Sequence, residues 1–221
     1  MISVRERGYF MTQNVILEMN GIDKRFHGVH ALKGVHFDLK SGEVHALVGE
    51  NGAGKSTLMK VLTGIHQPDE GEIYYLGSPY HVKNIGESQQ LGISMIHQEL
   101  NMMNHLTVAQ NMFIGRESMS GKMFINDGEM INEAQKLFDM IGIKIDPRTT
   151  LGNLTVGKQQ MVEIAKAVSY DARIIVLDEP TSSLNDREVE HLFRIIEKLR
   201  SRGCGIIYIS HKMEEILRIS D

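Results

Sequence analysis

Gly49-Glu50-Asn51-Gly52-Ala53-Gly54-Lys55-Ser56-Thr57 is the stretch that decides the fold of this 221-residue chain. It matches G-x-x-x-x-G-K-[ST], in which glycines let backbone N–H groups turn inward and surround phosphate oxygens at a helix N-terminus. Residues 43–48 before it predict a short strand, and residues 56–62 after it predict a helix. In such a loop Lys55 contacts the β- and γ-phosphates, and the Ser56 hydroxyl binds Mg²⁺. The chain is therefore predicted to bind a nucleotide.

The composition is that of an ordinary globular protein with a slightly acidic charge balance. The chain is 42% hydrophobic and 24% charged, and 24 Lys and Arg residues stand against 28 Asp and Glu residues. Because nucleic acid duplexes and anionic membranes favour basic surfaces, neither is an expected direct partner. No apolar run approaches the roughly 18 residues of a transmembrane helix. Arg5, Glu6 and Arg7 occupy the place of a signal peptide's apolar segment. These features favour a soluble cytoplasmic protein.

The cysteine and histidine residues give no sign of a disulfide or a metal site. Cys204 is the single cysteine, so it cannot form an internal disulfide, which fits a reducing compartment. It precedes an apolar strand and is interpreted as an inert, partly buried thiol. His27 and His30 are close in sequence, but a third metal ligand is not evident. We interpret both as solvated loop residues.

Apolar segments predict two groups of strands. The first group forms a layer that leads into the phosphate loop, and the later group alternates with helices, which predicts a mainly parallel sheet. The predicted strands span residues 15–19, 35–39, 73–76, 93–96, 174–177 and 206–209. Gly77 after the third strand suggests a hairpin. Ligand sites lie beyond the C-terminal ends of parallel strands, so Gly49, Gln98, Asp178 and His211 are expected to lie together.

The region from 100 to about 167 is predicted to be helical and is rich in methionine. Apolar residues at helical spacing over 130–141 predict an amphipathic helix that Gly142 ends. Met102, Met103 and Met112 have two interpretations. A methionine-lined helix usually packs into the core, but methionine also adapts to mobile interfaces, so contact with a partner stays open.

Asp178 and Glu179 end an apolar strand about 120 residues after the phosphate loop. A carboxylate in this place positions Mg²⁺ against phosphates, and a second acid directly after it can take a proton from an attacking water. The next helix is predicted to begin near Asn185, with Glu188 placed for a capping box, and to end at Gly203. The two acids therefore predict the hydrolytic half of a nucleotide site.

Residues 153–160, with the sequence NLTVGKQQ, open the helix before that acidic strand. Here the chain resembles the ATP-binding cassette ATPases, whose signature at this place is LSGGQ, and the resemblance covers about residues 14–221. Within that family, the amino-acid sequence of these motifs is most similar to that of the ATPases of bacterial monosaccharide importers. The segments that carry this similarity are GENGAGKSTLMKVLTG (49–64), IHQEL (96–100), LTVGKQQMVEIAKAV (154–168) and DEPTSSL (178–184).

The resemblance implies roles for single residues. Phe26 would stack on adenine, and Ser56, Gln98 and Asp178 would hold the metal ion. The residues with implied catalytic roles are Glu179 as the base, Lys55 as the group that stabilises the transferring charge, and Gln98 and His211 as sensors of the γ-phosphate.

The signature implies contact with a nucleotide held by a partner cassette. The residues for this contact are Leu154, Thr155, Gly157, Lys158 and Gln159. Thr155 keeps the hydroxyl of the usual serine, Val156 in place of glycine is typical of the importers, and Lys158 brings a positive charge in place of glutamine. Asn185 stands where the family often has Asp, in a loop that signals between sites, and it also fits a helix N-cap.

The fold implied is α/β: a P-loop NTPase core of the RecA-like, ABC ATPase type with an N-terminal antiparallel β-layer and an inserted α-helical subdomain. The core is expected at 13–98 and 166–221 and the helical subdomain at 99–165. Residues 1–12 are expected to be an extension, with Met1 or Met11 as the start. Chains of this subfamily continue past the histidine that His211 matches, usually into a second cassette. We therefore expect a partial chain that represents the first cassette.

The function implied is ATP hydrolysis, with ATP and Mg²⁺ as cofactors, that powers uptake of a monosaccharide or sugar-like solute at the cytoplasmic face of the membrane. The expected partners are a second cassette in a head-to-tail dimer, membrane permease subunits and, indirectly, a solute-binding protein, but no nucleic acid. One alternative is a soluble cassette ATPase that acts on ribosomes or DNA. The other is a GTPase or small-molecule kinase, although the chain has no N-K-x-D guanine motif. The sequence does not identify the solute.

Overall fold

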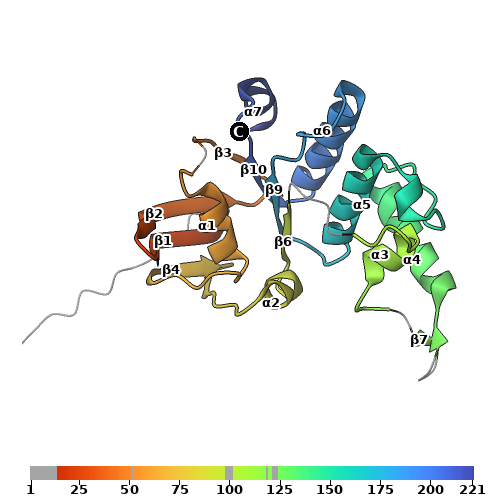
Figure 1. Cartoon of the computed structure of the whole chain (residues 1–221), viewed down its shortest axis with the longest axis horizontal. Coiled ribbons are helices and arrows are strands. Elements are labelled where there is room, and N and C mark those ends of the chain that lie inside the picture. The colour runs from red at the N-terminus through yellow and green to blue at the C-terminus, as the bar shows by residue number, and fades with distance from the viewer. Residues whose placement is uncertain (1–13, 51, 98–101, 118, 121–123) are drawn as a thin grey trace, which may run out of the picture.

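Two four-stranded β-sheets and a group of helices build the protein (Figure 1). The computed structural model describes residues 14–50, 52–97, 102–117, 119–120 and 124–221. In Figure 1 the N-terminal sheet lies on the left, the second sheet lies in the middle, and most of the helices lie on the right.

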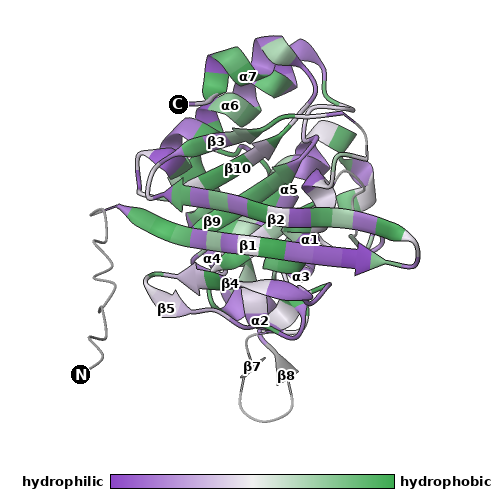
Figure 2. Ribbon diagram, turned by 90° about the vertical axis from the view of Figure 1, so that its left-hand side faces the viewer, coloured by the Kyte–Doolittle hydropathy of each residue, from purple (hydrophilic) through white to green (hydrophobic). Residues whose placement is uncertain are grey.

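The N-terminal sheet is antiparallel, as predicted. Its strand order is β2-β1-β4-β5, with β1 over Val15–Phe26, β2 over Val29–Lys40, β4 over Glu70–Tyr75 and β5 over Ser78–Pro79. Leu76 (φ 49°) and Gly77 (φ 74°) make the turn between β4 and β5, which confirms the predicted hairpin. Figure 2 views the molecule from the side of β1 and β2 and shows hydrophobic and hydrophilic residues interspersed along both strands.

The first two strands are much longer than the segments predicted at 15–19 and 35–39. Register shifts between Met19 and Lys24 indicate β-bulges, which interrupt the alternation of apolar and polar residues that a sequence pattern detects. The interpretation of His30 as a loop residue is therefore wrong. It lies in β2, where its Nε2 is 2.5 Å from Asp23 Oδ1.

The second sheet is parallel, also as predicted. Its order is β3-β10-β9-β6, with β3 over Val44–Leu47, β10 over Gly205–Ile209, β9 over Ile174–Asp178 and β6 over Ile93–Ile96. Ile209 is in register with both Leu47 and Asp178. The phosphate loop, Glu179 and His211 follow these strand ends, so the sheet brings them to one edge of the fold.

Helices flank the parallel sheet. The short α2 spans Ile85–Gln90, and α7 spans Met213–Ile219. The phosphate loop leads into α1 at Lys55–Leu62, and α6 at Asp186–Arg200 connects β9 to β10. Asn185 and Glu188 form the predicted capping box at the start of α6.

The region predicted to be helical from 100 to 167 is only partly so. It contains α3 at Val108–Phe113, α4 at Asp127–Ile141, a short 3₁₀ turn at Leu151–Asn153 and α5 at Val156–Val168, but also a hairpin of β7 at Met119–Ser120 and β8 at Phe124–Ile125. Gly142 ends α4 in a left-handed conformation, as predicted. The predicted boundary at 165 falls within α5, and the division into core and helical subdomain stays a prediction.

Two hydrophobic clusters fill the interior. One lies between the parallel sheet and the helices α3 to α6, and the other lies between the parallel sheet, α1 and the antiparallel sheet. Met112 is fully buried in the first cluster, which favours the core interpretation for this residue, whereas Met103 is 49% exposed. Cys204 is buried rather than partly buried, and burial raises the pKa of its thiol to about 12. None of the helices in the described part of the chain has the length and hydrophobicity that a membrane span requires.

Candidate functional site

The phosphate loop is packed tightly against the N-terminal sheet. Gly54, the residue before α1, has φ 89°, and a Cβ atom on it would lie 2.6 Å from the carbonyl oxygen of Ala31 in β2. A larger residue would therefore clash with backbone and would also be strained. This contact fixes the start of α1, so that the helix N-terminus faces the loop.

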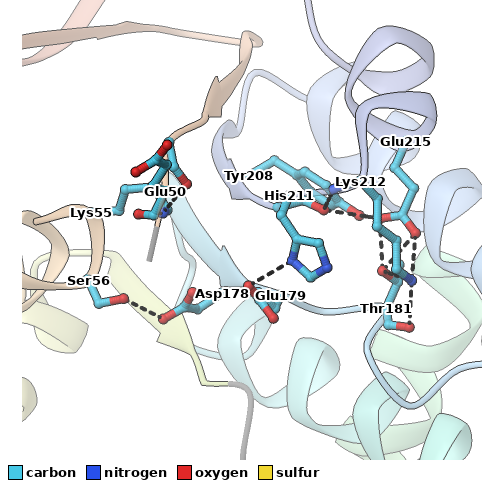
Figure 3. Close-up of polar contacts among 12 residues, drawn as sticks. Glu50, Lys55, Ser56, Asp178, Glu179, Thr181, Tyr208, His211, Lys212 and Glu215 are labelled. Carbon is cyan, nitrogen blue, oxygen red and sulfur yellow. Dashed lines mark hydrogen bonds and ion pairs between the residues drawn. The ribbon is translucent and has the colours of Figure 1, made fainter. Parts of the chain in front are cut away.

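The Lys55 ammonium group lies over the loop that precedes it. Its Nζ donates hydrogen bonds to the carbonyl oxygens of Gly49, at 2.6 Å, and Glu50, at 2.9 Å (Figure 3). The loop thus presents a positive charge together with the N-terminus of α1, which is the arrangement that phosphate groups require.

Ser56 and Asp178 meet across the site. The Ser56 hydroxyl donates to Asp178 Oδ2 at 3.4 Å, although the residues lie in α1 and β9 (Figure 3). Burial raises the pKa of the Asp178 carboxyl, the hydrogen bond from Ser56 opposes this shift, and the neighbouring Glu179 carboxylate adds to it. Among the described residues no cluster of three or more His, Cys, Asp or Glu side chains can hold a metal ion alone. One hydroxyl and one carboxylate fit Mg²⁺, which takes few protein ligands and completes its shell with phosphate oxygens and water.

Glu179 is held in an unusual backbone conformation beside His211. Its φ is 47°, its N–H donates to the carbonyl oxygen of Ile209 at 2.9 Å, and its Oε1 lies 3.1 Å from His211 Nδ1 (Figure 3). Left-handed backbone is uncommon for residues with a Cβ, and such strain concentrates at functional sites. The strand end therefore directs this carboxylate toward His211.

A pocket of about 520 Å³ lies between the phosphate loop and the strand end that carries Asp178 and Glu179. Of the predicted site residues, it is lined by Gly52, Ala53, Gly54, Lys55, Ser56, Thr57, Asp178 and Glu179. The remaining lining comes from Val29, His30, Ala31 and Ile209, which sequence reasoning missed. Val29, His30 and Ala31 carry no motif and are placed here by β2, whereas Ile209 ends the strand predicted at 206–209. Asn51 and Gln98 lie outside the described residues.

Phe26 lies beside this pocket. It pairs with Val29, which lines the pocket, and the residue is 40% exposed. The His66 ring packs against it edge-on with centroids 5.0 Å apart, and Lys24 Nζ lies 5.6 Å from the ring centroid. A partly exposed aromatic residue beside the phosphate pocket is suited to stacking on a base.

The signature residues do not join this pocket. They begin α5, on the other side of β6 and β9 from α1 (Figure 1). The Thr155 hydroxyl caps α5 by accepting from the Lys158 N–H at 3.4 Å, and the Gln159 side chain donates to the carbonyl oxygens of Leu151 and Leu154, each at 3.2 Å. The start of this helix is thus a formed structure, and it lies outside the pocket at the phosphate loop of the same chain.

Glu188 connects the signature to α6, a contact that the sequence did not reveal. Its Oε1 accepts from the Thr155 hydroxyl at 3.2 Å, and its Oε2 accepts from the Asn185 N–H at 3.1 Å and the Asn185 side-chain amide at 2.8 Å. Gly157 permits this approach, because a Cβ atom on it would lie 2.2 Å from the Glu188 carboxylate carbon. The capping pattern predicted Glu188 only as part of α6.

A second unpredicted network supports the segment around His211. The Glu215 carboxylate accepts from the hydroxyls of Thr181 and Tyr208, each at 2.8 Å, and pairs with Lys212 Nζ at 3.1 Å (Figure 3). Burial would raise the pKa of Glu215, but these hydrogen bonds outweigh burial and lower it. The network ties α7 to β10 and to the segment after Glu179.

Comparison with known proteins gives one family. The family model described as ABC transporter matches residues 32–182. Over 221 residues, all of this chain and 43% of the relative, the sequence is 53% identical to a protein of Agrobacterium fabrum named as a ribose/galactose/methyl galactoside import ATP-binding protein. It is also 53% identical, over 94% of this chain and 41% of the relative, to a galactose/methyl galactoside import ATP-binding protein of Mannheimia succiniciproducens. The chain thus spans about two fifths of the length of these curated relatives.

Solved structures show the same fold. An ATP-binding cassette of an ABC transporter in its ADP conformation superposes with a TM-score of 0.82 at 29% identity, covering 94% of this chain and 85% of that one. A bacterial ABC transporter cassette solved as a dimer gives a TM-score of 0.76 at 25% identity, covering 93% of this chain and 91% of that one.

Proposed function

We propose, because the chain belongs to the ABC transporter family, that it is an ATP-hydrolysing cassette of an importer for a monosaccharide or sugar-like solute. The pocket that gathers the phosphate loop, Asp178 and Glu179 is the observation that carries the hydrolytic part. The import names of its relatives support the solute class, with ribose and galactose as the first candidates. The same names give no support to the alternative of a soluble ATPase that acts on ribosomes or DNA.

ATP and Mg²⁺ are the proposed ligands of the pocket. Phe26 would hold the adenine ring, and the residues from Gly49 to Thr57 would surround the phosphates. Ser56 and Asp178 would hold Mg²⁺, with Gln98 as a third proposed ligand. When bound, the ion neutralises charge on the β- and γ-phosphates.

The side chains then divide the chemistry between them. Lys55 Nζ, which lies within 2.9 Å of two loop carbonyls, can turn to the phosphate oxygens and stabilise their developing charge. Glu179 would accept the proton of the attacking water as general base. His211 lies 3.1 Å from that carboxylate and would hold it in position while sensing the γ-phosphate.

The proposed site is completed by a second cassette. The start of α5 lies on the far side of the parallel sheet from α1 (Figure 1). The signature residues lie at this start or directly before it: Leu154, Thr155, Gly157, Lys158 and Gln159. They would therefore serve the nucleotide of a neighbouring copy in a head-to-tail dimer. Membrane permease subunits at the cytoplasmic face, and indirectly a solute-binding protein, are the other proposed partners.

The Glu179→Gln substitution tests this proposal, because it separates binding from chemistry. The amide keeps the size of the carboxylate but cannot accept the proton, and losing a general base typically lowers a rate about 10²–10⁴-fold. We expect the variant to bind ATP, to hydrolyse it very slowly and to elute as an ATP-dependent dimer in size-exclusion chromatography. Glu133→Gln, at an exposed position of α4, is the matched control. A folded Glu179→Gln variant that hydrolyses ATP at the wild-type rate would contradict the assignment of the base, and one that binds ATP but stays monomeric would contradict the head-to-tail dimer.

A further inference from the structure

A second pocket, as large as the one at the phosphate loop, lies between the end of α4 and the side of α6. Its volume is about 520 Å³. Its floor is apolar, with Ile141, Ile143, Ile145 and Met161 among its residues. The side chains around this floor are almost all basic: Lys144, Lys158, Arg187, His191, Arg194 and Lys198. None of the described residues that line the pocket is acidic.

The charges are concentrated by the geometry of α6. Arg187, His191, Arg194 and Lys198 follow the i, i+4, i+7, i+11 spacing that places side chains on one face of a helix. The row extends about 16 Å along the helix at 1.5 Å per residue. Lys158 of this pocket belongs to the signature, but it lies in α5, so the whole row on α6 lies outside the proposed nucleotide site.

Three of the four acids on α6 have hydrogen-bond or ion-pair partners outside the pocket. Glu188 binds Thr155 and Asn185, Glu190 pairs with Arg218, and Glu197 pairs with Arg200. Within the described part of the chain, none of the five Lys and Arg side chains of the pocket forms an ion pair with an acid. Arg194 also interacts electrostatically with Glu190, so the protein's own carboxylates relieve the repulsion among these five cations only in part.

The C-terminal end of α4 accounts for only part of this charge. His191 Nε2 lies 3.2 Å from the carbonyl oxygen of Gly142, and Lys198 Nζ lies 2.7 Å from the position that a Gly142 Cβ would take. A helix C-terminus carries about half a negative charge. Five full positive charges exceed this roughly tenfold, so a need to stabilise the end of α4 does not explain them.

We propose that this pocket binds a small phosphate ester. Two guanidinium groups suit bidentate contact with phosphate oxygens, and the lysines add charge without fixed geometry. The apolar floor suits the carbon skeleton of the ester, and the volume is in the range of small-molecule sites. The proposal does not depend on ATP hydrolysis, since it concerns a different pocket.

The test is a ¹H–¹⁵N NMR titration of the whole chain with glucose 6-phosphate at constant ionic strength. The protein is first saturated with MgADP, because a free phosphate loop would also attract the probe. We expect saturable shifts of the backbone amides of residues 142–145 and 194–198, with no further shift at the phosphate loop. The Arg194→Gln/Lys198→Gln double variant should weaken binding about tenfold or more, the scale of losing one or two charged hydrogen bonds.

Three controls make the outcome decisive. Lys136→Gln removes an exposed charge on α4 that does not line the pocket, and it should leave the titration unchanged. Arg187→Gln repeats the test at the other end of the row, in case the double variant is unstable. Glucose should cause no shifts, and inorganic phosphate should bind more weakly than the ester. Shifts that survive in the folded double and Arg187→Gln variants, equal binding of phosphate and ester, or no shift at 142–145 would each overturn the proposal.

Discussion

Replacement of Glu188 by alanine tests the contact between the signature and α6. In the structure one carboxylate serves two helix N-termini, since it accepts from Thr155 at the start of α5 and from Asn185 at the start of α6. Removing it breaks the capping box, worth about 1 kcal/mol, and a hydrogen bond to a charged acceptor that is partly exposed, worth about 0.5–1 kcal/mol. We expect the free energy of unfolding to fall by about 1–2 kcal/mol, which lowers the Tm of a chain this size by about 2–8 °C.

A double-mutant cycle isolates the part of this effect that belongs to Thr155. The four proteins are the wild type, Thr155→Ala, Glu188→Ala and the double variant, and urea unfolding gives their stabilities. Loss of the cap to the Lys158 N–H occurs in both Thr155 variants and cancels in the cycle. We expect a coupling energy of about 0.5–1 kcal/mol. Glu133→Ala, an exposed glutamate on α4, should change stability by less than about 0.5 kcal/mol. A coupling energy of zero within error would refute the bridge between the two helices.

Three further predictions concern single residues. Lys55→Ala should lower ATP hydrolysis by about 100-fold or more, because electrostatic stabilisation of the transition state is worth several kcal/mol, and near-normal turnover would contradict its role. Phe26→Ala should weaken the binding of ATP and of GTP alike, with a loss of about 1–2 kcal/mol in binding free energy. If calorimetry instead shows unchanged affinity and a lower Tm, Phe26 is a structural aromatic residue. The pKa of Glu215 is lowered in the folded protein. Its carboxylate therefore contributes fully to stability above the ordinary glutamate pKa, and this contribution is lost as the pH falls through the lowered pKa of the folded state. Urea unfolding should therefore show the wild type more stable than Glu215→Gln at neutral pH, with the difference shrinking in acid, and a difference that does not change with pH would rule out this linkage.

The parts of the site that the sequence predicted are those encoded in contiguous residues. The phosphate loop, the strand that ends in Asp178, and the capping box of Asn185 and Glu188 are each specified by a few neighbouring positions, so their structure follows from local chemistry. The order of the parallel strands then brings His211 to Glu179.

The parts that the sequence did not predict depend on tertiary register. His30 reaches the phosphate pocket because β2 begins at Val29, well before the strand predicted at 35–39. Thr155 and Glu188 lie far apart in sequence and belong to separate helices, and no spacing rule relates them. The acceptor role of Glu215 likewise requires the packing of α7 against β10, which no single segment encodes. Each of these contacts follows from how elements pack, whereas each motif follows from one element.

The contact between Thr155 and Glu188 also bears on how the two composite sites of the proposed dimer can influence each other. Glu179 precedes α6 by a short segment, and Glu188 in the first turn of α6 holds Thr155, so a path of direct contacts joins the proposed base to the signature of the same chain. A path of contacts is not yet a coupling, which requires that ligand binding change the energy of the contact. Repeating the double-mutant cycle at saturating MgATP separates the two cases. We expect the coupling energy between Thr155 and Glu188 to differ between the ATP-bound and ATP-free chain. An equal value in both states would make Glu188 a static brace, and signalling between the sites would then have to pass through another element.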